Sequence, residues 1–208
     1  MLKNVINIPH FRYALAIVFG LCSGLLVYFF ETGPGVTGME IHQWDMGSGN
    51  NVDGTFALQS AIFSGFIFGT IASLFVTLLE SFRVRVWFSL IVSSIVSYVI
   101  AVLVVPGLSL FLTSALLPSS TFILSSIVGS FIVSLGVIFS KIEVNRTRVL
   151  KRMLYFPLPA IVISIFVLYW ANDFSSYGIL RNQPIVFAIL HPFWQASIFC
   201  TLVSSIKK

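Results

Sequence analysis

The sequence predicts an all-α membrane protein: a six-transmembrane-helix bundle with both termini cytoplasmic and one long external loop between the first two helices. Of the 208 residues, 57% are hydrophobic and only 9% are charged, whereas soluble domains carry about 25% charged residues. Six runs without Asp, Glu, Lys or Arg are each close to the ~20 residues that a helix needs to cross the hydrocarbon core. The basic and acidic residues separate to opposite ends of these runs.

The six runs define the expected spans within a single transmembrane domain that covers residues 1–208. The first follows Lys3 and Arg12 and has no small-residue cleavage site behind it, so we expect a retained signal-anchor and not a removed signal peptide. The fifth contains Pro157 and Pro159 in its first turns, where a helix tolerates proline. The expected spans are residues 13–30, 55–79, 86–105, 121–140, 153–170 and 185–205.

The distribution of charge predicts the orientation. If the N-terminus is inside, eleven of the twelve basic residues fall on the inner side and only Arg181 falls outside, while five of the seven acidic residues fall outside. Basic residues collect in the cytoplasmic loops of membrane proteins. An even number of spans with both termini inside produces this asymmetry, and the compact chain with its short loops favours a bacterial inner membrane.

The basic inner segments are expected to contact lipid headgroups and to offer a docking surface to partner subunits. Topology alone accounts for the net charge of +5. The longest inner segment, which we expect to be a loop ending at Arg152, has about a dozen residues and leaves no room for a nucleic-acid partner. The residues expected at the docking surface are Arg83, Arg85, Arg146, Arg148, Lys151 and Arg152.

Small residues at four-residue spacing mark one side of several expected helices. Helices in lipid associate by close packing at such residues, so the stripes are either packing faces or, where they carry serine, the lining of a polar path for a solute. The stripes are Ala16, Gly20 and Gly24; Gly65, Gly69 and Ser73; Ser89, Ser93, Ser97 and Ala101; and Ser126, Ser130 and Ser134.

Residues 106–120 form an apolar, uncharged connection that is too short to cross the membrane and return. They fit either an interfacial segment or a re-entrant half-helix. The second alternative requires protein or a water-filled cavity to satisfy the backbone polar groups.

His191 is the one acidic or basic side chain, counting Asp, Glu, Lys, Arg and His, inside an expected span. It occurs in ILHPFWQAS, where Pro192 has no backbone N–H and leaves the carbonyl one turn earlier without its usual donor. Two interpretations remain: a neutral histidine bonded to a neighbouring helix, or a ligand contact shared with Trp194 and Gln195.

The external loop, residues 31–54, carries most of the acidic residues. Its Glu40, His42 and Asp45 have a spacing that matches no common zinc pattern, and GNNVDGT lacks the carboxylates that begin and end a calcium loop. We therefore expect no metal and no cofactor. His42, Trp44 and Asp45 are expected either to cap an outward-facing cavity or to contact a partner protein.

In helix count, chain length and long first external loop, the chain resembles the substrate-binding subunits of energy-coupling-factor vitamin transporters, and its layout is similar to that of six-helix permease subunits of ABC exporters. We expect a non-enzymatic membrane subunit, either a small-solute binding or transport component or an integral part of a larger complex. One alternative is an enzyme acting on a lipid or polyprenyl-linked substrate at the outer leaflet, using His191 with Asp45, Asp173 or Tyr177. The other is a scaffold or assembly protein.

Overall fold

The computed structural model describes residues 8–32, 54–80, 82–101, 117–140, 142, 144–155, 158, 162 and 183–206. This part of the chain is helical, and an isolated bridge between Val144 and Ile206 is its one β-type pairing. The helices are α2 (Pro9–Thr32), α3 (Gly54–Leu79), α4 (Val84–Val99), α6 (Leu117–Phe139), α7 (Arg146–Tyr155) and α10 (Gln183–Ser205).

Five of these helices coincide with expected spans, and the sixth helix differs from expectation. The helices α2, α3, α4, α6 and α10 occupy the first, second, third, fourth and sixth runs. The inner segment expected to be a loop instead contains α7, which takes in the first three residues of the run 153–170. Most of that run lies outside the described residues, as do the connection 106–116 and the external residues 33–53 with His42, Trp44 and Asp45.

Within the described residues, two helical segments are long and apolar enough to cross a membrane: Pro9–Phe29 and Ala61–Leu79. Val84–Val99 and Leu124–Phe139 are also apolar but shorter. In α10, Pro192 and the polar side chains of His191 and Gln195 interrupt the apolar sequence. By length and composition, the described residues therefore contain two candidate membrane spans.

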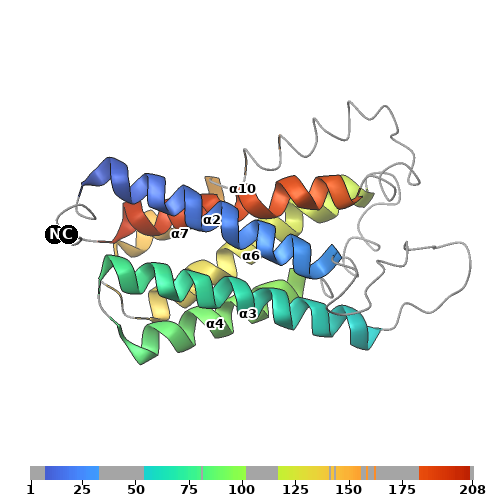
Figure 1. The fold of residues 1–208 in the computed structure, drawn as a ribbon, viewed down its shortest axis with the longest axis horizontal. Coiled ribbons are helices and arrows are strands. Elements are labelled where there is room, and N and C mark those ends of the chain that lie inside the picture. The colour runs from blue at the N-terminus through green and yellow to red at the C-terminus, as the bar shows by residue number, and fades with distance from the viewer. Residues whose placement is uncertain are drawn as a thin grey trace, which may run out of the picture.

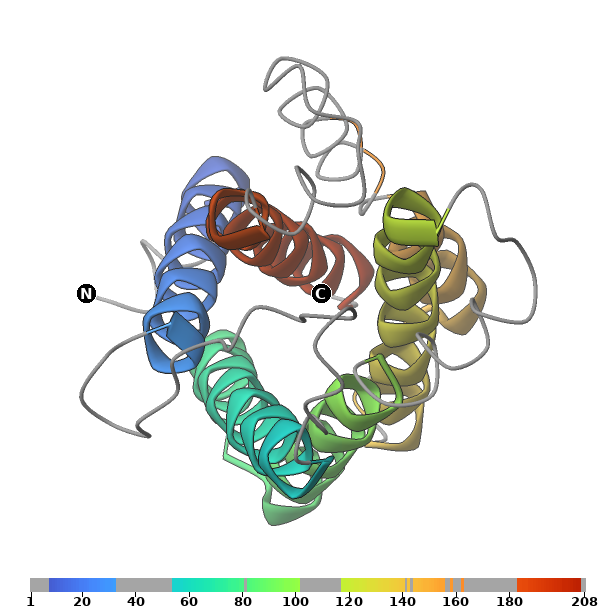
Figure 2. The same ribbon diagram turned by 90° about the vertical axis from the view of Figure 1, so that its right-hand side faces the viewer.

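The long helices lie side by side along one axis (Figure 1) and form a ring when viewed from the end (Figure 2). Helix α10 packs on α2, α3 packs on α4, α4 packs on α6, and α7 contacts both α6 and α10. The first residues of α2 and the last residues of α10 lie at the same end of the bundle (Figure 1).

Glycine allows the backbones of α2 and α10 to approach closely. A Cβ atom on Gly20 would collide with the backbone of Ala196, and one on Gly24 would collide with the backbone of Pro192. Gly65 in α3 faces the backbone of α4 in the same way, with Ile95 Cα 2.5 Å from the position a Cβ would take. These contacts confirm that the glycine stripes of α2 and α3 are packing faces.

Serine hydroxyls of α4 and α6 donate hydrogen bonds to carbonyls either in their own helix or in a neighbouring segment. Ser130 and Ser134 donate to carbonyls four residues back in their own helix, each at 2.7 Å, which is the usual behaviour of a buried serine in a helix. Ser89 instead donates across to the carbonyl of Gly136 in α6 at 2.6 Å, and Ser125 donates to the carbonyl of Ala101, two residues past the end of α4, at 3.1 Å. The bonds of Ser89 and Ser125 therefore connect α6 to α4 and to the residues just after it.

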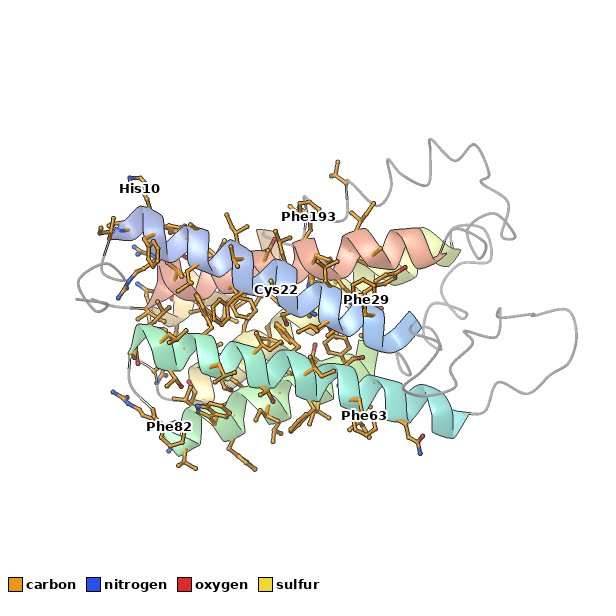
Figure 3. All side chains as sticks on the ribbon, viewed as in Figure 1. His10, Cys22, Phe29, Phe63, Phe82 and Phe193 are labelled. Carbon is orange, nitrogen blue, oxygen red and sulfur yellow. The ribbon has the colours of Figure 1, made fainter. Side chains whose placement is uncertain are left out.

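Aromatic side chains fill the centre of the bundle, while other large apolar side chains cover its outside. Phe75 packs against Phe199 with ring centroids 4.9 Å apart, edge to face, and both are fully buried. Phe63, Phe82 and Phe193 point away from the bundle (Figure 3), each with 44% or more of its surface exposed. An apolar outer surface is what contact with lipid tails requires.

We expect Gly24→Val to destabilise the bundle by about 3 kcal/mol, because the new side chain meets backbone atoms of Pro192 that cannot rotate away. The measurement is unfolding of the purified protein in mixed micelles with increasing SDS, followed by far-UV circular dichroism. Val18→Leu is the matched control, since Val18 is on the same helix and 55% exposed. Unfolding of Gly24→Val at the wild-type SDS fraction would contradict this account of the contact between α2 and α10.

Candidate functional site

The candidate site is a polar cluster on the inward face of α10. His191, Trp194 and Gln195 are three and four residues apart, so they lie on one side of the helix. Gln195 is fully buried, Trp194 is buried and His191 is half-buried. The polar cluster, as defined here, consists of Ser97, Tyr98, Ser126, Ser130, His191, Trp194 and Gln195.

Gln195 connects α10 to α4. Its amide nitrogen, Nε2, donates a hydrogen bond to the hydroxyl of Tyr98 at 2.8 Å, and Tyr98 is itself 4% exposed. A buried tyrosine or glutamine needs such a partner, because an unmet polar group in an apolar interior costs about 1–3 kcal/mol. The bond therefore links α10 to α4 across the ring of helices.

Trp194 connects α10 to α6. Its indole nitrogen donates to the hydroxyl of Ser130 at 2.9 Å and lies 3.3 Å from the carbonyl oxygen of Ser126. Gly129 makes room for the ring, since a Cβ atom there would lie 3.2 Å from the indole Cζ2. Ser126 and Ser130, in the serine stripe of α6, therefore accept hydrogen bonds from a side chain of α10.

Four aromatic rings from three helices, one of them the imidazole of His191, lie in or beside the polar cluster. The imidazole of His191 stacks on the ring of Tyr98 with centroids 6.0 Å apart and an interplanar angle of 12°. Trp194 meets Tyr98 edge to face at 6.0 Å and lies 5.6 Å from Phe68 of α3. The polar groups of the cluster are thus enclosed by flat apolar faces.

Among the buried polar atoms of the cluster, Gln195 Oε1 and Ser97 Oγ make no hydrogen bond to the described part of the chain. Ser97 Oγ lies 2.9 Å from the position that a Cβ on Gly129 would take, on the same side of α6 as Trp194. Buried groups of this kind are normally satisfied by protein, water or a ligand. The cluster can therefore offer an acceptor, the amide oxygen, and a hydroxyl to a small polar molecule.

The predicted site residues divide into two sets. His191, Trp194 and Gln195 lie on one side of α10, and His191 contacts a neighbouring helix through its stack on Tyr98. His42, Trp44 and Asp45 are outside the described residues, so their position relative to His191 is not described. Within the residues described, no three His, Cys, Asp or Glu side chains gather as metal ligands.

The structure describes all six basic residues that we expect at a docking surface. Arg83, Arg85, Arg146, Arg148 and Lys151 are exposed, and Arg152 is half-buried. On α7, Val149 and Met153 are buried, so the helix packs with its apolar side inward and presents its basic side outward.

Tyr98 was missed by reading the sequence, although it belongs to three of the contacts in the cluster. A signal was present: it is the one tyrosine in the run 86–105, next to the serine stripe, and a tyrosine hydroxyl in an apolar helix usually finds a partner.

A double-mutant cycle between Tyr98→Phe and Gln195→Leu should give a coupling free energy of about 1 kcal/mol, because both variants remove the same hydrogen bond. Unfolding in SDS mixed micelles measures it. Tyr98→Phe combined with Ser197→Ala is the control, because Ser197 bonds the carbonyl of Phe193 in its own helix. That control pair should be additive. Additivity of the Tyr98 and Gln195 substitutions would show that the bond contributes nothing to stability.

The chain has no match to a protein-family model, to a curated protein or to a solved structure. Fold and function are different inferences in any case, and function depends on the geometry and chemistry of particular side chains.

Proposed function

We propose that the protein is an integral membrane protein with six spans and both termini in the cytoplasm, as in a bacterial inner membrane. The start of α2 and the end of α10 share one end of the bundle (Figure 1). The segment before α7 lies at that end, because Asn145 N donates to Ser205 O at 3.3 Å. Arg85, at the start of α4, reaches Phe139 at the end of α6. The helix ends and connecting segments that meet here carry basic residues. Because basic residues collect on the cytoplasmic side of membrane proteins, this arrangement supports an inner, cytoplasmic face.

Within this topology, the function that we propose is binding and transport of a small solute, with the polar cluster as its contact. The observation that carries the proposal is the buried Gln195 Oε1, which accepts no hydrogen bond from the described residues. A polar group kept at this cost inside an apolar bundle is retained for a role in function. A solute with a hydrogen-bond donor satisfies the oxygen, and a flat apolar body fits against the surrounding aromatic rings.

Entry of the solute requires the cluster to open, because its side chains are packed against one another. We propose that α10 bends at Pro192, where the helix lacks a backbone N–H. Such a bend separates Gln195 from Tyr98 and exposes both hydrogen-bonding groups. Broken helices of this type line the binding sites of many transporters.

A second candidate, an integral subunit of a larger complex, is favoured by α7. The exposed Arg146, Arg148 and Lys151 are held at the surface by the buried Val149 and Met153, which suits an acidic cytosolic partner. The enzyme alternative gains no such support, because Asp45, Asp173 and Tyr177 lie outside the described residues.

Retention of a solute by the purified protein tests the proposal. Wild type, Gln195→Leu and Ser197→Ala are purified in a mild detergent, and small molecules released on denaturation are compared by mass spectrometry. We expect a solute enriched with wild type and with Ser197→Ala, and lowered about 5- to 100-fold with Gln195→Leu, since the lost hydrogen bond is worth about 1–3 kcal/mol.

Identical small-molecule profiles for the three folded proteins would contradict the solute-binding proposal. If the same preparations also contain a stoichiometric cytosolic protein, which is lost when Arg146, Arg148 and Lys151 are replaced by Gln, the second candidate takes its place.

A further inference from the structure

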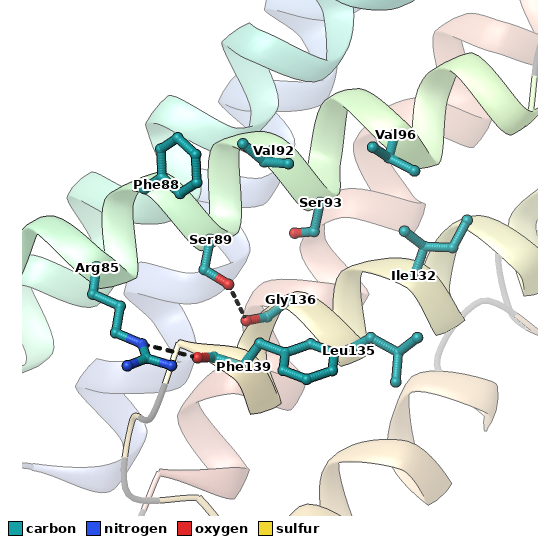
Figure 4. A pocket seen from close by; sticks show the side chains of 10 residues that line it. All are labelled: Arg85, Phe88, Ser89, Val92, Ser93, Val96, Ile132, Leu135, Gly136 and Phe139. Carbon is teal, nitrogen blue, oxygen red and sulfur yellow. Dashed lines mark hydrogen bonds between the residues drawn. The ribbon is translucent and has the colours of Figure 1, made fainter.

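A surface groove separates α4 from α6 (Figure 4), and the described residues that line it do not belong to the polar cluster. Its volume is about 360 Å³. Its walls are apolar and come from both helices. They include Phe88, Val92 and Val96 of α4, and Ile132 and Leu135 of α6.

The polar groups in the groove are already bonded within the protein. The hydroxyl of Ser89 donates to the carbonyl of Gly136 at 2.6 Å, as Figure 4 shows, and the hydroxyl of Ser93 donates to Leu90 at 3.2 Å. Gly136 lets the two helices approach here, since a Cβ atom on it would collide with Ser93. The groove therefore presents apolar surface to whatever occupies it, and Phe88 is 71% exposed along its edge.

One end of the groove carries a positive charge. Arg85 is the single charged residue among the ten that line it, and its Nε donates to the carbonyl of Phe139 at 3.2 Å. This bond holds the guanidinium beside the end of α6, and its terminal amino groups are donors suited to a phosphate or carboxylate. Among the described residues that line the groove, no carboxylate competes for them.

The length of the groove matches one leaflet of a bilayer. From Arg85 to Val96, a helix rising 1.5 Å per residue advances roughly 16 Å, and half of the hydrocarbon core is about 15 Å. A cation at the headgroup level followed by an apolar channel of this length is complementary to an anionic lipid.

We propose that the groove is a binding site for an anionic phospholipid, with the phosphate on Arg85 and an acyl chain between α4 and α6. The inference rests on the membrane topology proposed above, and it is independent of the polar cluster. It assigns Arg85 a role that the general basic surface does not have, since Arg83 is also exposed but does not line the groove.

The test is lipid binding to the delipidated, purified protein by native mass spectrometry. The probes are phosphatidylglycerol and phosphatidylcholine with the same acyl chains. We expect Arg85→Gln to weaken phosphatidylglycerol binding by about 10- to 100-fold and to leave phosphatidylcholine less affected, since a hydrogen bond to a charged group contributes about 1.5–3 kcal/mol. Arg83→Gln is the matched control and should behave as wild type, and Arg85→Lys should retain most of the preference.

A second variant tests the apolar part of the site. Ile132→Trp places an indole in the groove and should weaken binding of both lipids equally. Equal loss of phosphatidylglycerol binding in Arg85→Gln and Arg83→Gln would overturn the proposal, because the effect would be one of general surface charge. So would unchanged lipid binding in Ile132→Trp accompanied by loss of an oligomer, because the occupant would then be a helix. Gln195→Leu should keep the lipid preference, which separates failure of this site from failure of the solute site.

Discussion

Backbone contact at glycine is the constraint on which the arrangement of the bundle depends. Helices surrounded by lipid gain little from hydrophobic association, so close approach of their backbones has to supply much of the contact energy. Gly20 and Gly24 seat α2 directly on the backbone of α10 at Ala196 and Pro192. With Pro192 and Ala196 turned toward α2, the geometry of a helix directs Trp194 to α6 and Gln195 to α4.

The use of polar groups in the interior follows from the same environment. Several serine hydroxyls of α3 and α6 bond carbonyls in their own helix, as Ser73 and Ser134 do, and so cost little in an apolar interior. Trp194 and Gln195 of α10 differ because they bond other helices, and Gln195 Oε1 has no partner among the described residues. The α4–α6 groove has the opposite arrangement. Its serine hydroxyls are hydrogen-bonded within the protein, and its apolar walls favour an apolar occupant.

Much of the helical architecture could be predicted from the sequence, because length and hydropathy are local properties: α3 and α10 begin and end within two residues of the expected runs. The helix α7 was missed because twelve mostly polar residues resemble a loop, although Val149 and Met153 are four apart, as an inward-facing stripe requires. Tyr98, Ser130 and Phe68 could not be assigned to the site, because the face of α4 or α6 that meets α10 is set by how the helices cross. His191, Trp194 and Gln195 could be assigned, because they share one helix face.

Cysteine accessibility tests the central claim, an oriented six-span bundle, most directly. In a background with Cys22 and Cys200 replaced by Ala, single cysteines are placed at Ser48, Thr147 and Ser175 and treated with a membrane-impermeant maleimide. Thr147 is an exposed residue of α7. The proposed topology predicts labelling of Ser48→Cys and Ser175→Cys in intact cells, and of Thr147→Cys only after permeabilisation. Labelling of Thr147→Cys in intact cells, or protection of Ser175→Cys, would contradict it.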